Sequence, residues 1–183
     1  PLRRKTWISL GWMWIKLCYH AKHTEKYTEE EQYKMLRFIT LHANKGGNVK
    51  IDVHGVENLP KDNGFMFFPN HQGLYDVLAI IEACPRPFSV VAKKEIANIQ
   101  FLKQVFACMK AYMLDREDVR QAMQVIVHVT EEVKRGRNYL IFAEGTRSKN
   151  GNKVGEFKGG SFKSATKAKC PIVPVALIDS FKP

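Results

Sequence analysis

The stretch FMFFPNHQGLYD at residues 65–76 decides the fold of this chain. Four consecutive apolar residues, 65–68, are typical of a strand that is buried on both faces, and Pro69 ends the run. A polar turn follows, and from Asp76 to Cys84 the pattern becomes helical. A buried strand that leads through a polar turn into a helix is the first half of a parallel α/β unit.

The same alternation of strand and helix continues along the chain. Val49, Ile51 and Val53 alternate with polar residues, which predicts a half-buried strand just before the decisive stretch. Further strands are predicted at residues 88–91, 111–114, 139–142 and 172–177, and further helices at residues 95–109, 118–135 and 159–168. The predicted fold is therefore α/β, with a mostly parallel sheet flanked by helices over residues 48–183.

An N-terminal amphipathic helical hairpin is predicted over residues 1–47, ahead of this domain. Its uncharged stretch at residues 6–15 is much shorter than the roughly 20 apolar residues that span a bilayer. Three tryptophans lie close to a basic cluster at residues 3–5, which suits a helix in the lipid headgroup region: Trp7, Trp12 and Trp14. A helix that simply packs on its own domain explains this segment equally well. In the second helix, Thr28 and Glu31 have the spacing of a capping box.

Composition and charge narrow the class of partner. The 183 residues are 45% hydrophobic and 26% charged, which is typical of a globular protein, and the mean hydropathy of -0.29 argues against a multi-span membrane protein. A net charge of +11 predicts an anionic partner. The basic run at residues 147–169 is interrupted by glycines and has few aromatics for base stacking, so we expect no nucleic-acid partner. Four widely spaced cysteines indicate reduced thiols without a metal site: Cys18, Cys84, Cys108 and Cys170.

Polar clusters follow three of the predicted strands, at residues 70–76, 115–116 and 144–148. In a parallel sheet, the loops at the carboxyl ends of the strands meet at one edge. On one regular helix His71 and Asp76 would be about 140° apart, so they meet only if His71 lies in the turn and Asp76 opens the helix. The carboxylate would then fix the imidazole tautomer and leave the other nitrogen as a general base. A helix-capping Asp76 beside a polar loop histidine remains the alternative.

The third cluster offers groups that bind phosphate. Gly145, Thr146 and Arg147 can present backbone N–H groups, a hydroxyl and a guanidinium, and Arg116 could reach the same anion. The alternative is a surface turn in which Glu144 pairs with Arg147.

Together these motifs resemble those of a known protein family. The pattern His71-x-x-x-x-Asp76, followed by FAEGTRS at residues 142–148, resembles the glycerophospholipid acyltransferase family, and within it the 1-acyl-sn-glycerol-3-phosphate acyltransferases. The resemblance covers about residues 50–178. Ala143 stands where the family commonly has proline.

The resemblance implies a reaction and a role for each matching residue. A fatty acyl chain would pass from acyl-CoA or acyl carrier protein to the sn-2 hydroxyl of 1-acyl-glycerol-3-phosphate, giving phosphatidic acid, without a cofactor or a metal. His71 would act as the general base and Asp76 would orient it. The residues implied in binding the acceptor are Lys93, Arg116, Glu144, Gly145, Thr146, Arg147 and Lys158.

The resemblance also implies a location on the cytoplasmic side of a membrane, peripheral or monotopic, with anionic lipid as a partner. Because the family continues beyond the strand that contains Pro174, we expect the acyltransferase domain to be truncated at its C-terminal end. Two alternatives stay open. The chain could be a non-catalytic basic lipid-binding module, although such a module has no reason to keep the His71–Asp76 pair. It could also act on another acceptor, such as glycerol-3-phosphate or another lysolipid.

Overall fold

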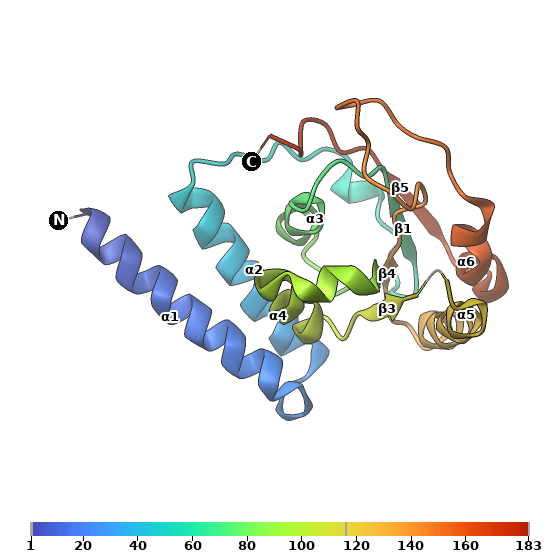
Figure 1. Ribbon diagram of the computed structural model, residues 1–183, viewed down its shortest axis with the longest axis horizontal. Coiled ribbons are helices and arrows are strands. Elements are labelled where there is room, and N and C mark those ends of the chain that lie inside the picture. The colour runs from blue at the N-terminus through green and yellow to red at the C-terminus, as the bar shows by residue number, and fades with distance from the viewer. Residues whose placement is uncertain (1, 116, 183) are drawn as a thin grey trace.

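A five-stranded parallel sheet organises the chain, in the strand order β3-β2-β4-β1-β5 (Figure 1). The computed structural model describes residues 2–115 and 117–182, with side chains described from residue 11 onward. The strands are β1 (Met66–Pro69), β2 (Ser89–Lys93), β3 (Tyr112–Leu114), β4 (Tyr139–Leu140) and β5 (Ile172–Val175). The predicted parallel α/β fold is confirmed.

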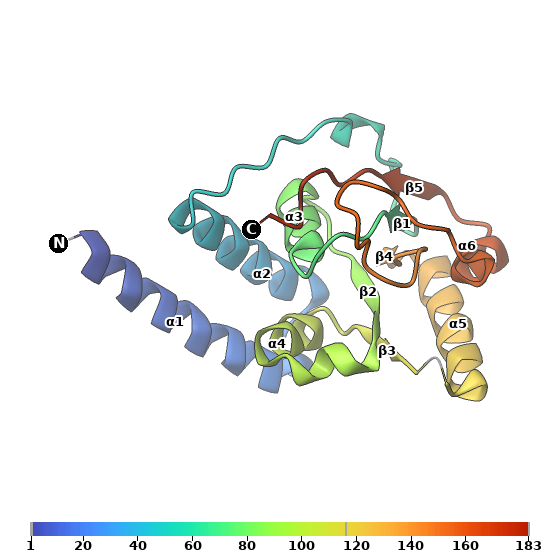
Figure 2. The same ribbon diagram turned by 45° about the horizontal axis from the view of Figure 1, so that its top comes forward.

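Helices cover both faces of the sheet (Figures 1 and 2). They are α1 (Leu2–Lys22), α2 (Glu29–Gly46), α3 (Asp76–Ala83), α4 (Gln100–Cys108), α5 (Val119–Lys134) and α6 (Lys163–Ala168). Short 3-10 helices are η1 (Thr24–Lys26), η2 (Val56–Asn58), η3 (Lys94–Asn98) and η4 (Gly159–Phe162). The first four α-helices pack on one side of the sheet, and α5 and α6 pack on the other.

The apolar run at the start of β1 supplies both halves of the core. Phe65 and Phe67 belong to the cluster formed with α1, α2, α3 and α4, whereas Met66 and Phe68 belong to the cluster formed with α5 and α6. Successive side chains of a strand point to opposite faces. An uninterrupted apolar run is therefore what a strand with helices on both sides requires.

The predicted strand at residues 49–53 is wrong. The segment forms no strand, and it runs as an irregular chain from α2 to η2. Ile51 is partly buried while Lys50, Asp52 and Val53 are exposed, so the alternation reflects one-sided contact with the domain. A strand also needs a hydrogen-bonded neighbour, and both edges of the sheet are formed by other segments, β3 and β5.

The N-terminal helices share the core of the domain. The predicted capping box at the start of α2 is confirmed: Glu31 N–H donates to Thr28 Oγ1 over 3.2 Å, and Thr28 N–H donates to Glu31 Oε2 over 2.8 Å. Met13 and Leu17 of α1 are buried in the same cluster as α3 and α4. Residues 1–47 and 48–183 are thus joined by a continuous apolar core. Among the helices described, none has both the length and the apolar character needed to cross a bilayer.

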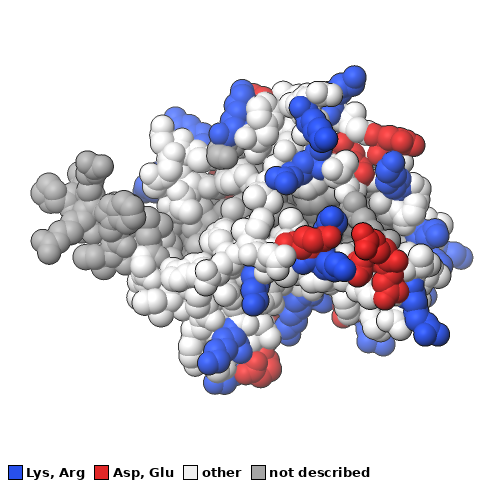
Figure 3. All heavy atoms as spheres, in the orientation of Figure 1, with Lys and Arg blue, Asp and Glu red and all other residues white. Residues whose placement is uncertain are grey.

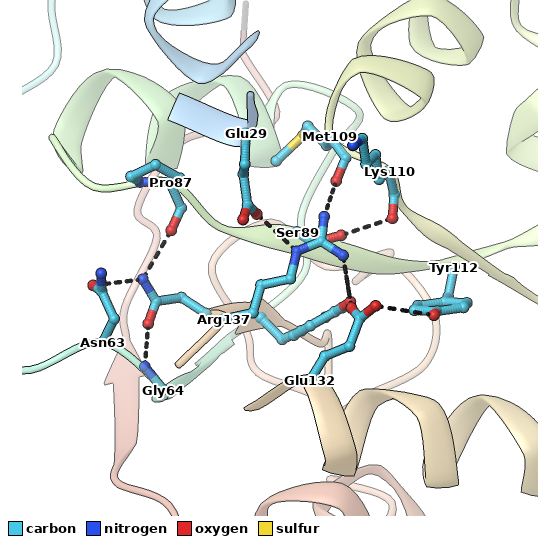
Figure 4. A network of polar contacts seen from close by, with 12 residues as sticks. Glu29, Asn63, Gly64, Pro87, Ser89, Met109, Lys110, Tyr112, Glu132 and Arg137 are labelled. Atoms are coloured by element: carbon cyan, nitrogen blue, oxygen red, sulfur yellow. Dashed lines mark hydrogen bonds and ion pairs between the residues drawn. The ribbon is translucent and has the colours of Figure 1, made fainter. Parts of the chain in front are cut away.

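A partly buried arginine ties α2 to the residues that flank the sheet (Figure 4). Arg137 donates from Nε to Glu29 Oε1 of α2 and from Nη1 to Glu132 Oε2 of α5, each over 2.7 Å, and from Nη2 to the Met109 carbonyl over 2.9 Å. Burial by itself would lower the pKa of Arg137, but the hydrogen bond with Glu29, the Tyr139 hydroxyl and the bond with Glu132 raise it. For Glu132, an acid, burial by itself would raise the pKa. Hydrogen bonds from Tyr139 and Arg137 outweigh burial and lower the pKa of Glu132 below its ordinary value.

Candidate active site

The loop between β1 and α3 brings His71 and Asp76 together. His71 lies in the loop and Asp76 is the first residue of α3, and the His71 Nδ1 atom is 2.6 Å from Asp76 Oδ2. This is the geometry that the spacing of five residues requires, and the predicted contact is confirmed.

The surroundings of Asp76 define the state of the pair. Its side chain is fully buried. Oδ2 also accepts the Gln72 N–H over 2.7 Å, both oxygens accept the Gly73 N–H over 3.1 Å, and Oδ1 accepts the Ser180 hydroxyl over 2.6 Å. Backbone N–H groups can only donate, so Asp76 accepts from Gln72 and Gly73, and its Oδ2 is placed to accept from His71 Nδ1 as well; with Nδ1 as the donor, Nε2 is the ring nitrogen left to accept a proton. Because these donors lie before the helix or far from it, Asp76 is not merely a helix cap.

The loop after β4 holds the imidazole in place. The ring of His71 stacks on Phe142, with centroids 3.9 Å apart and an interplanar angle of 20°. The His71 N–H donates to Glu144 Oε1 over 2.7 Å, and the His71 carbonyl accepts the Ser148 N–H over 2.8 Å. Backbone and ring of His71 are both fixed, while its side chain keeps 19% of its surface exposed.

Glu144 joins two loops of the site through its carboxylate. Its side chain is buried, and its second oxygen, Oε2, accepts the Gly155 N–H over 2.6 Å. A side chain at Gly155 would collide with this carboxylate, since a Cβ atom there would lie 2.6 Å from Oε2. With one oxygen accepting the His71 N–H and the other the Gly155 N–H, Glu144 braces the two loops at the cavity wall. The alternative ion pair with Arg147 is not formed, because both oxygens of Glu144 have these other partners.

His71 opens onto a cavity of about 630 Å³. Part of its wall is polar, exposed and mostly cationic, and includes five predicted residues: Lys93, Gly145, Thr146, Arg147 and Lys158. The rest of the wall is buried and apolar, with side chains from β2, α4 and α5: Val90, Leu102, Phe106, Val125 and Val129. On the face shown in Figure 3, Lys and Arg side chains are spread over the described surface, with Asp and Glu side chains among them on the right-hand part. A cavity with one cationic and one apolar wall suits an amphiphilic anion.

The cationic side chains differ in their partners. Lys93 Nζ lies 3.0 Å from Glu95, and Lys158 Nζ lies 3.4 Å from Glu156, both as exposed ion pairs that contribute little to stability. Arg147 has no ion pair with any carboxylate in the described residues. Its guanidinium is therefore available to a bound anion. The predicted residue Arg116 lies outside the described residues.

Two parts of the site were not predicted from the sequence. The apolar wall is one, and its signal was the spacing of four between Val125 and Val129, which places both on the inner face of α5. The second unpredicted part is the contact of Ser180 with Asp76. No local pattern predicts this contact, because 104 residues separate the two.

Comparisons with known proteins identify relatives of this chain. The family model described as Acyltransferase matches residues 50–178. A 1-acyl-sn-glycerol-3-phosphate acyltransferase from Borreliella burgdorferi is 34% identical over 132 residues, which are 72% of this chain and 52% of that protein. The alpha form of the enzyme from Mus musculus is 29% identical over 150 residues, covering 80% of this chain and 52% of that protein. The chain thus spans about half the length of these relatives.

A solved structure matches at the level of the fold. The crystal structure of the 1-acyl-sn-glycerophosphate acyltransferase PlsC from Thermotoga maritima aligns with a TM-score of 0.60 and 23% identity, covering 94% of this chain and 73% of that one. The family match extends from the end of α2 beyond β5 and includes both loops of the site. On this evidence the chain belongs to the acyltransferase family.

Proposed function

We propose that this protein is an O-acyltransferase that moves a fatty acyl chain from acyl-CoA or acyl carrier protein to the sn-2 hydroxyl of 1-acyl-glycerol-3-phosphate, giving phosphatidic acid. The observation that carries the proposal is the His71–Asp76 pair at the wall of a cavity that is cationic on one side and apolar on the other. The names of the two relatives support the choice of lysophosphatidic acid as the acceptor.

The chemistry follows from the tautomer of His71. Nε2 takes the proton of the acceptor hydroxyl as that oxygen attacks the thioester carbonyl carbon. The carbon–sulfur bond then breaks, the new ester bond remains, and the imidazolium returns the proton to the leaving thiolate. A positioned general base of this kind accelerates transfer by roughly 10²- to 10⁴-fold. Asp76 stabilises the imidazolium and keeps Nε2 as the reactive nitrogen.

The acceptor phosphate is assigned to the exposed wall. The Gly145 N–H donates to the Phe142 carbonyl over 3.0 Å and is turned into the loop. Within the described part of the chain, the N–H groups of Thr146 and Arg147 have no acceptor, so they remain for a ligand together with the two side chains. Lys93 and Lys158 add positive charge at the same cavity. The apolar wall takes an acyl chain.

The outer side of α1 is assigned to the membrane interface, on the cytoplasmic side. While Met13 and Leu17 pack inward, large apolar side chains on the other side of α1 are exposed: Trp12, Trp14, Ile15 and Tyr19. The Trp14 ring stacks on Phe101 of α4 at 6.5 Å, and Lys16 lies over the Trp12 ring at 5.1 Å. Indole rings beside lysines favour the headgroup layer of anionic lipid.

Point substitutions test this surface better than a deletion does, because removing α1 would uncover the core. Trp12→Ser together with Ile15→Ser should reduce flotation with vesicles that contain phosphatidylglycerol, while turnover on detergent-dispersed acceptor stays at the level of the unmodified protein. Equal flotation of the double variant and the unmodified protein would assign α1 a structural role alone.

One assay tests the enzyme function. The protein is incubated with lysophosphatidic acid and either acyl-CoA or acyl carrier protein, and phosphatidic acid is measured. His71→Ala should abolish product formation, whereas His54→Ala, at an exposed histidine far from the cavity lining, should leave it unchanged. If the unmodified protein and both variants bind lysophosphatidic acid equally and none of them forms phosphatidic acid, the protein is a non-catalytic lipid-binding module. Transfer to glycerol-3-phosphate in preference to lysophosphatidic acid would indicate the other acceptor class.

A further inference from the structure

We propose that Ser180 is a positioning residue for the reaction, which holds the Asp76 carboxylate in the orientation that His71 needs. The inference rests on the proposed function of His71 as the general base. Its basis is the hydrogen bond of 2.6 Å from the Ser180 hydroxyl to Asp76 Oδ1, on the oxygen that does not face the imidazole. Ser180 is buried and does not line the cavity, so it acts through Asp76 and does not touch the substrate.

The Ser180 hydroxyl has a single proton and two neighbouring acceptors. Gln72 Oε1 is 3.0 Å away and Asp76 Oδ1 is 2.6 Å away. The shorter contact is with the charged group, and hydrogen bonds to ionised acceptors are the stronger ones. Gln72 Oε1 is also satisfied by the Ser180 N–H over 2.9 Å. The hydroxyl proton therefore belongs to Asp76.

The chain after β5 is built to deliver this hydroxyl. Residues 176–182, here called the return segment, turn back from β5 toward α3 (Figures 1 and 2). Asn70 holds the start of the segment, with Oδ1 accepting the Leu177 N–H over 2.6 Å and Nδ2 donating to the Leu177 carbonyl over 3.0 Å. Asn152 Oδ1 accepts both the Gln72 side-chain amide and the Asp179 N–H, each over 2.8 Å.

The backbone beside Ser180 is strained. Asp179 has a φ of 61°, a left-handed conformation that non-glycine residues seldom adopt. Such a conformation persists only where its surroundings impose it. Here the bonds from Asn152 to the backbone and side chain of Asp179 impose it, and they direct the next residue toward Asp76.

The return segment also lies directly on the catalytic loop. A Cβ atom at Gly73 would be 3.3 Å from the Ser180 carbonyl oxygen and 3.5 Å from Phe181 Cα. Any side chain at position 73 would press the segment away from the loop. The absence of a side chain at Gly73 is thus part of what allows the Ser180 hydroxyl to reach Asp76.

Removing the hydroxyl would leave the carboxylate unevenly held. Oδ2 would keep its bonds with His71, Gln72 and Gly73, but Oδ1 would keep only the longer, shared contact with the Gly73 N–H. The carboxylate could then rotate, and the His71 ring would lose its fixed orientation toward the acceptor hydroxyl. A displacement of about 1 Å at a reacting group can lower a rate by roughly 100-fold.

The test compares Ser180→Thr with Ser180→Val. The two side chains have nearly the same shape and differ in the hydroxyl. With lysophosphatidic acid as acceptor, we expect Ser180→Val to lower kcat by about 10- to 100-fold with the acceptor KM changed by less than about two-fold, whereas Ser180→Thr keeps most of the turnover. Lys182→Ala is the matched control, since it removes an exposed ion pair with Asp179 in the same segment and leaves the bonds that direct Ser180, and it should lower kcat much less than Ser180→Val does.

Each other outcome overturns the inference. Equal turnover of the Val and Thr variants would remove any role for the hydroxyl. A loss in Lys182→Ala as large as that in Ser180→Val would make tethering of the segment the whole effect. If Ser180→Val does not fold, as judged by thermal denaturation, Ser180→Ala takes its place in the same comparison. The same assay tests the proposed function separately. If His71→Ala keeps its turnover, the proposed function is wrong. If His71→Ala is inactive and Ser180→Val is active, only the role of Ser180 is refuted.

Discussion

Asp76→Asn is the substitution that isolates the charge of the catalytic pair. The Oδ2 position receives three donors, from His71, Gln72 and Gly73, so the amide oxygen of an asparagine belongs there. The amide nitrogen then faces the Ser180 hydroxyl, which can turn its proton to Gln72 Oε1 at 3.0 Å. The variant should therefore fold, and it should keep the proton of His71 on Nδ1.

The expected loss is the electrostatic stabilisation of the imidazolium. When Nε2 takes the acceptor proton, the ring becomes a cation beside the carboxylate, and about 4 Å between the two charge centres at an effective dielectric constant of 20 corresponds to about 4 kcal/mol. That free energy is roughly a 10³-fold decrease in kcat. The acceptor KM should change little, because Asp76 is fully buried and does not line the cavity.

The assay is the initial rate of phosphatidic acid formation over a range of lysophosphatidic acid concentrations, with thermal denaturation as the control for folding. Because Asp76 acts only through His71, adding Asp76→Asn to His71→Ala should cause no further loss. A folded Asp76→Asn protein with less than a ten-fold decrease in kcat would refute the electrostatic reasoning. A large additional loss in the double variant would show that Asp76 also acts by another route.

Three further outcomes are expected. Arg147→Ala should raise the acceptor KM by roughly 10- to 100-fold with little change in kcat, since it removes a charged hydrogen bond worth about 1.5–3 kcal/mol; an unchanged KM would place the phosphate elsewhere. Because the pKa of Glu132 is lowered in the folded protein, its pairing with Arg137 stabilises the fold above the ordinary glutamate pKa of about 4.3 and is lost as the pH falls through the lowered value. In urea denaturation, Glu132→Gln should thus have a lower free energy of unfolding than the unmodified protein at pH 7, and the two free energies should become equal in acid. The same difference in free energy at both pH values would contradict this. Ala122→Phe, at the cavity wall, should reduce turnover of long-chain acyl donors more than that of short-chain donors, and an equal reduction for both would place the chain outside this wall.

The strands that were predicted correctly are those whose signal is local. The run at residues 65–68 is apolar at every position because helices cover both of its faces, and Pro69 marks its end. The failure at residues 49–53 has the opposite cause. Alternation records which side chains touch the domain, but the hydrogen-bonded neighbour that makes a strand is set by distant parts of the chain.

The same distinction separates the parts of the site. His71 and Asp76 lie five residues apart, so the spacing and a glycine showed that the two can meet, and the family resemblance favoured their contact over a helix-capping Asp76. The braced position of Glu144 depends on the N–H groups of His71 and Gly155, from two different loops. The residues alone suggested an ion pair with Arg147 in a surface turn, and the resemblance implied a contact with the acceptor. Nothing in the local pattern indicates that distant backbone groups donate to both oxygens.

The place of β1 in the sheet has a consequence for synthesis of the chain. Its neighbours are β4 and β5, and both follow it late in the sequence. At 5–20 residues per second, β5 leaves the ribosome roughly 5–20 s after β1, since about 100 residues separate them. Until β4 has emerged, Phe65, Phe67 and Phe68 have no strand on either side, and from then until β5 emerges they have a strand on one side only. Long-range parallel pairing is slow to form and exposes apolar segments to aggregation, so the nascent chain should depend on chaperones until β5 has emerged.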